Sequence, residues 1–173
     1  MLFVLMIIVL NGPLGIGKTT LAEALTESIE YCVMLDGDRL VAANPSPADP
    51  LEHLHSTIAL LVEHHRQFGY RHFVIDHLWR SPAELADLRR RLLAIDTDTE
   101  IRSFVLTLPA DENLRRIERR QHARVIDERE FELRTYEEER ELLTKTSDLG
   151  EPFDVSAPPA KLVAMMLHRL ALR

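Results

Sequence analysis

The residues with the clearest chemical pattern lie between Gly12 and Thr19, in the sequence Gly-Pro-Leu-Gly-Ile-Gly-Lys-Thr. The three glycines permit backbone conformations closed to other residues, so that successive N–H groups can turn inward around an anion. Lys18 can then reach the β- and γ-phosphates of a nucleotide, and the Thr19 hydroxyl can bind Mg²⁺. The spacing matches G-x-x-x-x-G-K-[ST] and predicts a nucleoside triphosphate site. The residues expected to bind the nucleotide are Gly12, Gly15, Ile16, Gly17, Lys18, Thr19 and Thr20.

Two carboxylates follow the next apolar segment, in the sequence Asp36-Gly37-Asp38. An Asx turn with solvated side chains also explains these residues. Beside a phosphate loop, one carboxylate can hold Mg²⁺ through water, and the other can take a proton from an acceptor hydroxyl as a general base. We assign the metal to Asp36 and the base to Asp38, because Asp38 lies further from the strand and nearer to a substrate.

A third polar cluster begins at Asp76, which ends an apolar segment as the Walker B aspartate of nucleotide-binding proteins does. The next residue is His77, whereas a motor-type ATPase needs a glutamate there to activate water. We expect Asp76, His77, Trp79 and Arg80 to border the acceptor, together with Arg39 after the second strand. The alternative is a surface loop in which Trp79 packs on the following helix.

Strands and helices must alternate along the chain to gather these groups. Apolar segments predict five strands, at residues 2–10, 31–35, 73–76, 101–108 and 153–155. Residues at helical spacing lie between them, and Ser81-Pro82-Ala83-Glu84 is typical of a helix start. The alternation predicts a parallel sheet in one domain over residues 1–173, with right-handed crossovers and helices on both faces. Ligands bind such sheets beyond the carboxyl ends of the strands, where all three clusters lie.

Arginines gather on and just after the helix expected beyond the fourth strand. A solvated charged face is the usual interpretation of such a run, but its position favours phosphate contacts for one or two members. The segment from about 115 to 145 has many charges for its apolar content, so we expect it to form a mobile lid. The arginines are Arg115, Arg116, Arg119, Arg120 and Arg124.

Composition narrows the classes of function. The chain has 173 residues and a net charge of −7, which argues against a broad nucleic-acid surface. The single cysteine, Cys32, excludes an internal disulfide and fits a cytoplasmic protein. The apolar N-terminal run lacks the basic residues and cleavage site of a signal peptide and is too short to cross a bilayer, so we expect a core strand and no membrane partner.

The combination of Gly12–Thr19 with Leu35-Asp36-Gly37-Asp38 resembles the P-loop small-molecule kinases, which include shikimate, gluconate and adenylylsulfate kinases and chloramphenicol phosphotransferase. The resemblance implies a three-layer α/β P-loop NTPase fold with a five-stranded parallel sheet of order 2-3-1-4-5. It also implies a helical lid after strand four and Mg·ATP as the phosphate donor.

The resemblance further implies roles for individual residues. Asp36 would help to hold magnesium, and Asp38 would meet the acceptor. Arg120 would lie against the adenine and Arg124 would reach the γ-phosphate, while Pro158, in the turn at 156–159, would cover the other side of the adenine. The acceptor stays open, because the G-G-G of shikimate kinase is replaced by Asp-His-Leu-Trp and Arg39 falls near, but not on, the arginine of adenylylsulfate kinase.

These observations favour an enzyme that moves the γ-phosphate of Mg·ATP to a hydroxyl of a small molecule, either a metabolite, a nucleoside or an antibiotic. One alternative is a 5′-hydroxyl polynucleotide kinase, which the negative charge disfavours. Another is a P-loop ATPase or nucleotide-binding switch with no acceptor. A GTPase would carry an N/T-K-x-D motif, and the nearest candidate, Thr144-Lys145-Thr146-Ser147, fails at the last position.

Overall fold

The computed structural model describes residues 4–121 and 128–172, and its centre is a five-stranded sheet. The strands lie in the order β2-β3-β1-β4-β5, and every neighbouring pair is parallel. This confirms the predicted order 2-3-1-4-5. All residues of the central strand β1 are buried, as an almost unbroken apolar run requires. The strands are β1 (Met6–Asn11), β2 (Cys32–Asp36), β3 (His72–Asp76), β4 (Glu100–Thr107) and β5 (Glu151–Asp154).

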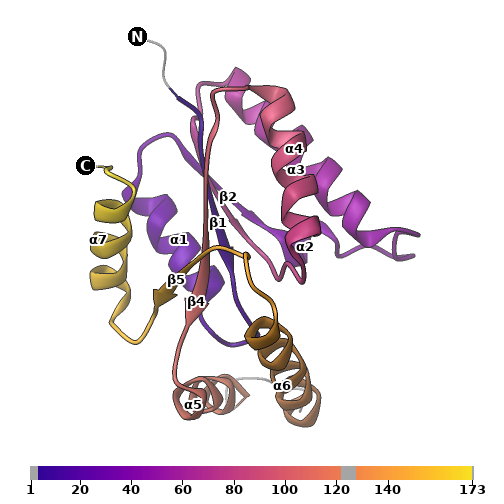
Figure 1. Cartoon of the computed structure of the whole chain (residues 1–173), viewed down its shortest axis with the longest axis vertical. Helices are drawn as coiled ribbons and strands as arrows, with labels where there is room; N and C mark the ends of the chain where they lie inside the picture. Colours follow the sequence, from indigo (N-terminus) through magenta and orange to yellow (C-terminus); the bar gives the residue numbers. More distant parts are fainter. Residues whose placement is uncertain (1–3, 122–127, 173) are drawn as a thin grey trace.

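Seven helices are formed by the described residues: α1 (Lys18–Ser28), α2 (Gly37–Leu40), α3 (Pro50–Gln67), α4 (Pro82–Ile95), α5 (Ala110–Gln121), α6 (Arg129–Lys145) and α7 (Pro159–Arg169). Helices α1 and α7 cover one face of the sheet, and α3 and α4 cover the other (Figure 1). Helices α5 and α6 lie beyond the end of the sheet where β1 and β4 finish (Figure 1). The predicted three-layer α/β class is therefore confirmed.

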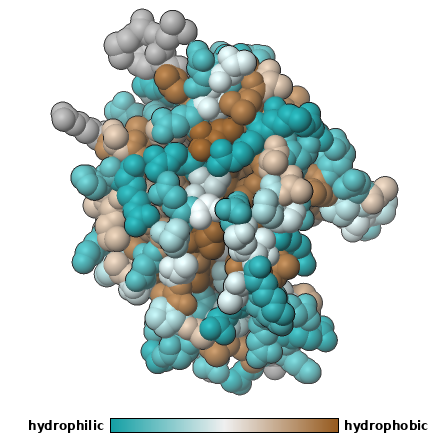
Figure 2. Space-filling view, in the orientation of Figure 1, coloured by the Kyte–Doolittle hydropathy of each residue, from teal (hydrophilic) through white to brown (hydrophobic). Residues whose placement is uncertain are grey.

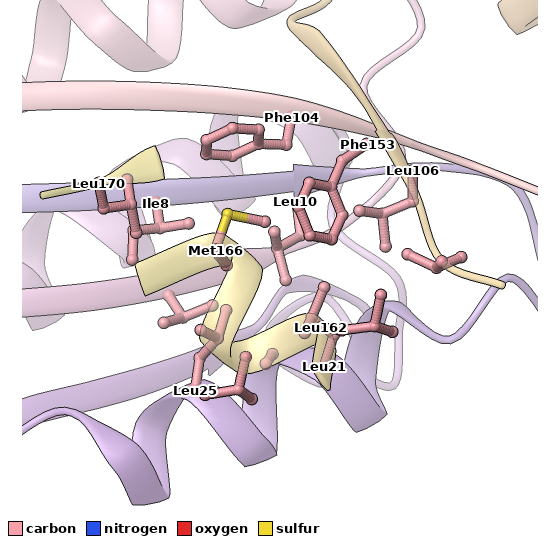
Figure 3. Close-up of a cluster of buried hydrophobic side chains, with 14 of the residues drawn as sticks. Ile8, Leu10, Leu21, Leu25, Phe104, Leu106, Phe153, Leu162, Met166 and Leu170 are labelled. Carbon is pink, nitrogen blue, oxygen red and sulfur yellow. The ribbon is translucent and has the colours of Figure 1, made fainter. Parts of the chain in front are cut away.

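Each face of the sheet has its own apolar core. Between the sheet and the pair α1 and α7, the side chains of Leu10, Phe104 and Phe153 meet Met166 of α7 (Figure 3). Each large apolar side chain buried in this way stabilises the fold by about 1.5–3 kcal/mol. These two cores hold the sheet rigid, so the loops at its carboxyl edge have a fixed base.

The helix starts follow from local capping chemistry. The Asp49 carboxylate accepts a hydrogen bond from the backbone N–H of Glu52 at 3.0 Å, and the Ser81 hydroxyl accepts one from that of Glu84 at 3.3 Å. The predicted capping box at Ser81 is modified, because the Glu84 carboxylate accepts from the N–H of Arg80 at 2.6 Å. The short helix α2 was not predicted, since four residues carry no periodic signal.

Hydrophilic residues cover much of the face of the molecule seen in Figure 2, including most of the end formed by α5 and α6. Smaller apolar areas lie among them (Figure 2). In the part of the chain that the structure describes, no helix is both long and apolar enough to cross a bilayer.

Candidate nucleotide and acceptor site

The loop from Gly12 to Thr19 joins β1 to α1 at the carboxyl edge of the sheet. Gly15 has φ +74° and Gly17 has φ +102°, a conformation that other residues rarely adopt. A Cβ at Gly15 would also lie 2.4 Å from Cγ1 of Ile117 on α5. Both the backbone conformation and the lack of space therefore require glycine at this position. The loop thus has the positive-φ glycines that a phosphate cradle requires, and α1 begins at Lys18 directly behind it.

Lys18 is the cation of this loop. Its Nζ donates hydrogen bonds to the carbonyl oxygens of Gly12 at 2.8 Å and Pro13 at 3.3 Å, which holds the side chain along the loop. Burial lowers the pKa of Lys18, while the nearby carboxylates of Asp38 and Glu139 oppose the shift. The loop therefore presents a partly desolvated ammonium, a group that gains much from an incoming polyphosphate.

Asp76 lies against the phosphate loop. Its Oδ2 accepts a hydrogen bond from the Thr19 hydroxyl at 2.9 Å, and its side chain is only 2% exposed. Among the described residues its Oδ1 has no hydrogen-bond partner. Burial raises the pKa of Asp76 to about 6, and the neighbouring carboxylates of Asp36 and Asp38 add to the shift. An unpaired buried carboxylate oxygen beside a threonine hydroxyl is the environment that a hard cation stabilises.

Asp36 is placed differently from Asp76, although the two residues are paired across β2 and β3. Its Oδ1 accepts from the N–H groups of Asp38 at 3.0 Å and Arg39 at 3.2 Å, which caps α2. Its Oδ2 lies 3.1 Å from Nε of Arg39, whose side chain is exposed. The Asx-turn interpretation of Asp36 thus describes its contacts, and the Thr19 hydroxyl meets Asp76 instead.

Asp38 lies at the front of this carboxyl edge. Its side chain is 73% exposed, and its Oδ1 lies 2.8 Å from Nδ1 of His77. The hydrogen bond from His77 lowers the pKa of Asp38, and the charge of Lys18 also contributes. Asp38 is therefore an ionised carboxylate beside the phosphate loop, accessible to solvent.

The prediction that Trp79 lines the acceptor pocket is wrong. Its side chain is 0% exposed and belongs to the core on the α3 and α4 face. The side-chain amide of Asn11 accepts from the Trp79 N–H at 3.2 Å and donates to its carbonyl oxygen at 3.0 Å, while the indole N–H donates to Nε2 of His55 at 3.2 Å. Arg80, the next residue, is exposed, so it remains available at the rim.

A cavity of about 430 Å³ opens in front of the phosphate loop. It is bounded by α5 and by the turn between β5 and α7, and Asp38 forms part of its wall. Pro158 is exposed at the N-cap of α7, and its neighbours Ala157 and Pro159 face the cavity in its place. The residues around it include Leu14 to Leu21, Asp38, Arg116, Arg119, Arg120, Val155, Ala157, Pro159 and Leu162.

Arg116 connects the two walls of this cavity. Its guanidinium donates to the carbonyl oxygen of Ile16 at 3.1 Å and to that of Val155 at 3.0 Å. The family resemblance implied that Arg120 lies against the adenine. In the structure Arg120 pairs with the buried Glu132 of α6 at 2.6 Å and still borders the cavity. The spacing of Arg116, four residues before Arg120, is the sequence feature that could have indicated its place at the cavity. Arg124 lies outside the described residues.

Glu139 of α6 is a site residue that sequence reasoning missed. Its Oε2 accepts a hydrogen bond from the backbone N–H of Leu14, in the phosphate loop, at 2.6 Å. Burial raises the pKa of Glu139, while this hydrogen bond and the charges of Lys18 and Arg80 oppose the shift. No signal in the sequence separates Glu139 from the other glutamates of α6, because its partner is 125 positions away.

The fold and the loop together define a P-loop protein of the kinase-like class. A family model described as AAA domain (AAA_33) matches residues 7–144, so the chain belongs to this family. The chain matches no curated protein in sequence.

Solved structures support the same class. A gluconokinase from Sinorhizobium meliloti has a TM-score of 0.65 at 18% identity, over 95% of this chain and 90% of its own. The tunicamycin resistance protein of Deinococcus radiodurans has a TM-score of 0.65 at 20% identity, over 96% of each chain. A shikimate kinase from Bacteroides thetaiotaomicron has a TM-score of 0.61 at 16% identity, over 97% of this chain and 99% of its own. At these identities the likeness establishes the fold.

Proposed function

We propose that this protein is a phosphotransferase that moves the γ-phosphate of ATP to a hydroxyl of a small molecule. The observation that carries the proposal is the position of Asp38: an ionised, exposed carboxylate lines the same cavity as the phosphate loop and interacts with Lys18. Phosphoryl transfer needs a cradle for the donor phosphates and a carboxylate for the acceptor proton, and both are present here.

Magnesium fits the residues on the donor side. The unpaired Oδ1 of the buried Asp76 lies in the side chain that already bonds Thr19, and oxygen ligands of this kind suit Mg²⁺. Mg²⁺ usually takes only one or two protein ligands and completes its shell with water and phosphate, so a larger acidic cluster is not required. We assign the metal to Thr19 and Asp76, with Asp36 as a neighbouring charge. When bound, the ion neutralises charge on the phosphates.

The chain's own residues then divide the work. Lys18 draws electron density from the transferring phosphoryl group, and the loop N–H groups hold its oxygens. The planar guanidinium of Arg116 forms one wall of the site for the adenine of ATP. Asp38 accepts the proton of the acceptor hydroxyl as the new O–P bond forms, and ADP leaves with the old bridging oxygen. Helices α5 and α6 act as the lid that excludes water over this reaction.

The experiment combines the protein with Mg·ATP and a pooled library of metabolites, nucleosides, antibiotics and 5′-hydroxyl oligonucleotides. ADP formation that requires a library member, with one phosphate added to that member by mass spectrometry, supports the proposal. Steady ADP formation without an acceptor favours an ATPase or switch and overturns it, as does phosphorylation restricted to 5′-hydroxyl oligonucleotides. Lys18→Ala is the matched inactive control, because it removes the cation of the loop.

A further inference from the structure

The contact between His77 and Asp38 joins the ends of two strands at the front of the site. The distance from Nδ1 of His77 to Oδ1 of Asp38 is 2.8 Å, and the histidine side chain is 19% exposed, against 73% for the aspartate. An ionised carboxylate has no hydrogen to donate, so the histidine must be the donor and its Nδ1 must carry the hydrogen. One oxygen of Asp38 is thereby held, in a side chain that is otherwise largely exposed.

The backbone at Gly37 is shaped to admit this histidine. A Cβ added at Gly37 would lie 2.7 Å from Cβ of His77 and 2.9 Å from both Cγ and Nδ1 of its ring. Real side chains do not approach so closely, so any other residue at 37 would displace the imidazole. Gly37 is itself buried and has no positive φ, which means that the close approach of His77 explains the need for glycine better than backbone conformation does.

The imidazole of His77 also contacts Trp79. The two rings are 5.4 Å apart between centroids and nearly perpendicular, at 82°, which is a favoured edge-to-face geometry. Hydrogen bonds hold Trp79 in place, because Asn11 bonds its main chain and His55 bonds its indole N–H. His77 therefore contacts a buried, hydrogen-bonded tryptophan and lies close to a glycine that leaves it room.

We propose that His77 is a positioning residue for the phosphoryl-transfer reaction: its Nδ1–H holds one oxygen of Asp38 so that the other oxygen points at the acceptor hydroxyl. The proposal rests on the function proposed above for Asp38. The proton of the acceptor passes to the other oxygen of Asp38, and His77 keeps its Nδ1 hydrogen throughout. The arrangement fixes the tautomer of the histidine in the same way that a carboxylate does in hydrolase triads.

The first experiment observes the tautomer directly, without any substrate. Protein labelled with ¹⁵N in histidine is examined by two-bond ¹⁵N–¹H correlation, and the His77 signals are assigned from their loss in His77→Asn. We expect Nδ1–H in the native protein and a change toward the Nε2–H form in Asp38→Asn. A native His77 in the Nε2–H form overturns the proposal. Because no acceptor is involved, this result stands whether or not the protein proves to be a kinase.

The second experiment separates positioning from general structural support. We expect His77→Ala to lower kcat by about 10- to 100-fold, the effect of losing one hydrogen bond to a charged group, with KM for Mg·ATP changed less than about two-fold. His77→Asn keeps an N–H near the position of Nδ1 and should restore most of kcat. In an Asp38→Asn background, His77→Ala should have no further effect, since its target is gone.

Two further variants guard against misfolding as the cause. Gly37→Ala should reproduce the loss of kcat by displacing the imidazole, while His64→Ala, an exposed histidine on α3, should leave kcat unchanged. Thermal unfolding of each variant checks that the fold is retained. Equal losses in kcat for His77→Ala and His77→Asn, or additive losses with Asp38→Asn, overturn the proposal.

Discussion

At the scale of single residues, three carboxylates of the site lie near one lysine. Asp38, Glu139 and Asp76 all act electrostatically on Lys18, yet each is held by a different partner. Histidine holds Asp38, a loop N–H holds Glu139, and a threonine hydroxyl holds Asp76. Because the partners differ, the three acids can be removed one at a time and should give three distinct effects.

The first prediction concerns Asp38 as the base. Asp38→Asn should leave Mg·ATP affinity nearly intact, since the residue stands on the acceptor side, and should lower kcat by about 10²- to 10⁴-fold. Calorimetric titration with Mg·ATP and a coupled ADP assay measure the two quantities. Unchanged turnover would remove Asp38 from the chemistry.

The second prediction uses the raised pKa of Asp76, which lies near 6 against an ordinary 3.8. Between pH 4 and 6 the folded protein keeps a proton on Asp76 that the unfolded chain has lost. The free energy of unfolding therefore falls as pH rises through this window, by on the order of 2 to 3 kcal/mol for this group. Asp76→Asn should remove that decline when urea unfolding without nucleotide is followed at several pH values.

The matched control for this pH series is Asp98→Asn, an exposed carboxylate in the turn before β4. It should preserve the decline seen in the native protein. Identical slopes for the native protein and Asp76→Asn would mean that Asp76 is not protonated in this range.

At the scale of elements, α3 and α4 are joined by a polar cluster on the face opposite α1. Asp87 of α4 accepts hydrogen bonds from Nδ1 of the buried His55 of α3 at 2.9 Å and from Nε of Arg91 at 2.8 Å, and Arg91 also reaches Glu52 of α3. These bonds, that from His55 above all, hold the pKa of Asp87 well below its usual range. The cluster therefore stabilises the helix pair only while Asp87 is ionised.

A third prediction follows for Asp87. The stabilisation is complete above pH 4 and is lost as pH falls below the ordinary aspartate range, since the unfolded chain takes up a proton first. Asp87→Asn should cost about 1–2 kcal/mol at pH 7 and should flatten the acid limb of a stability-versus-pH curve from urea unfolding. An equally steep acid limb in the variant would contradict the assignment.

Sequence patterns predict the elements well and the contacts between distant elements poorly. Apolar periodicity located all five strands, because buried strands and amphipathic helices carry their environment in their own residues. Trp79 was misplaced because its partners, Asn11 and His55, are 68 and 24 positions away. Arg116 and Glu139 meet the phosphate loop through the packing of α5 and α6 against it, and no local pattern encodes that packing.

At the scale of the whole molecule, α6 is attached to the phosphate loop through Glu139, and to α5 through the pair between Arg120 and Glu132. We expect Glu139→Ala to free α6 from the loop, because a hydrogen bond to a charged group is worth about 1.5–3 kcal/mol. Hydrogen–deuterium exchange over residues 129–145 should then quicken by about ten-fold or more.

The control for this fourth prediction is Glu138→Ala, the exposed neighbour on the same helix. It should leave exchange over α6 unchanged. Equal exchange in the native protein and Glu139→Ala would show that α6 is held over the loop by its apolar contacts alone.

The side chain of Asn11 has a consequence for how such a lid can open. Its side-chain amide accepts a hydrogen bond from the N–H of Trp79 and donates one to the carbonyl oxygen of Trp79. The side chain thus makes the same pair of hydrogen bonds that a backbone peptide group makes in a sheet. These two hydrogen bonds connect the end of β1, which leads into the phosphate loop, to the segment that carries His77. We therefore expect the spacing between the phosphate loop and His77 to be the same whatever position α5 and α6 take.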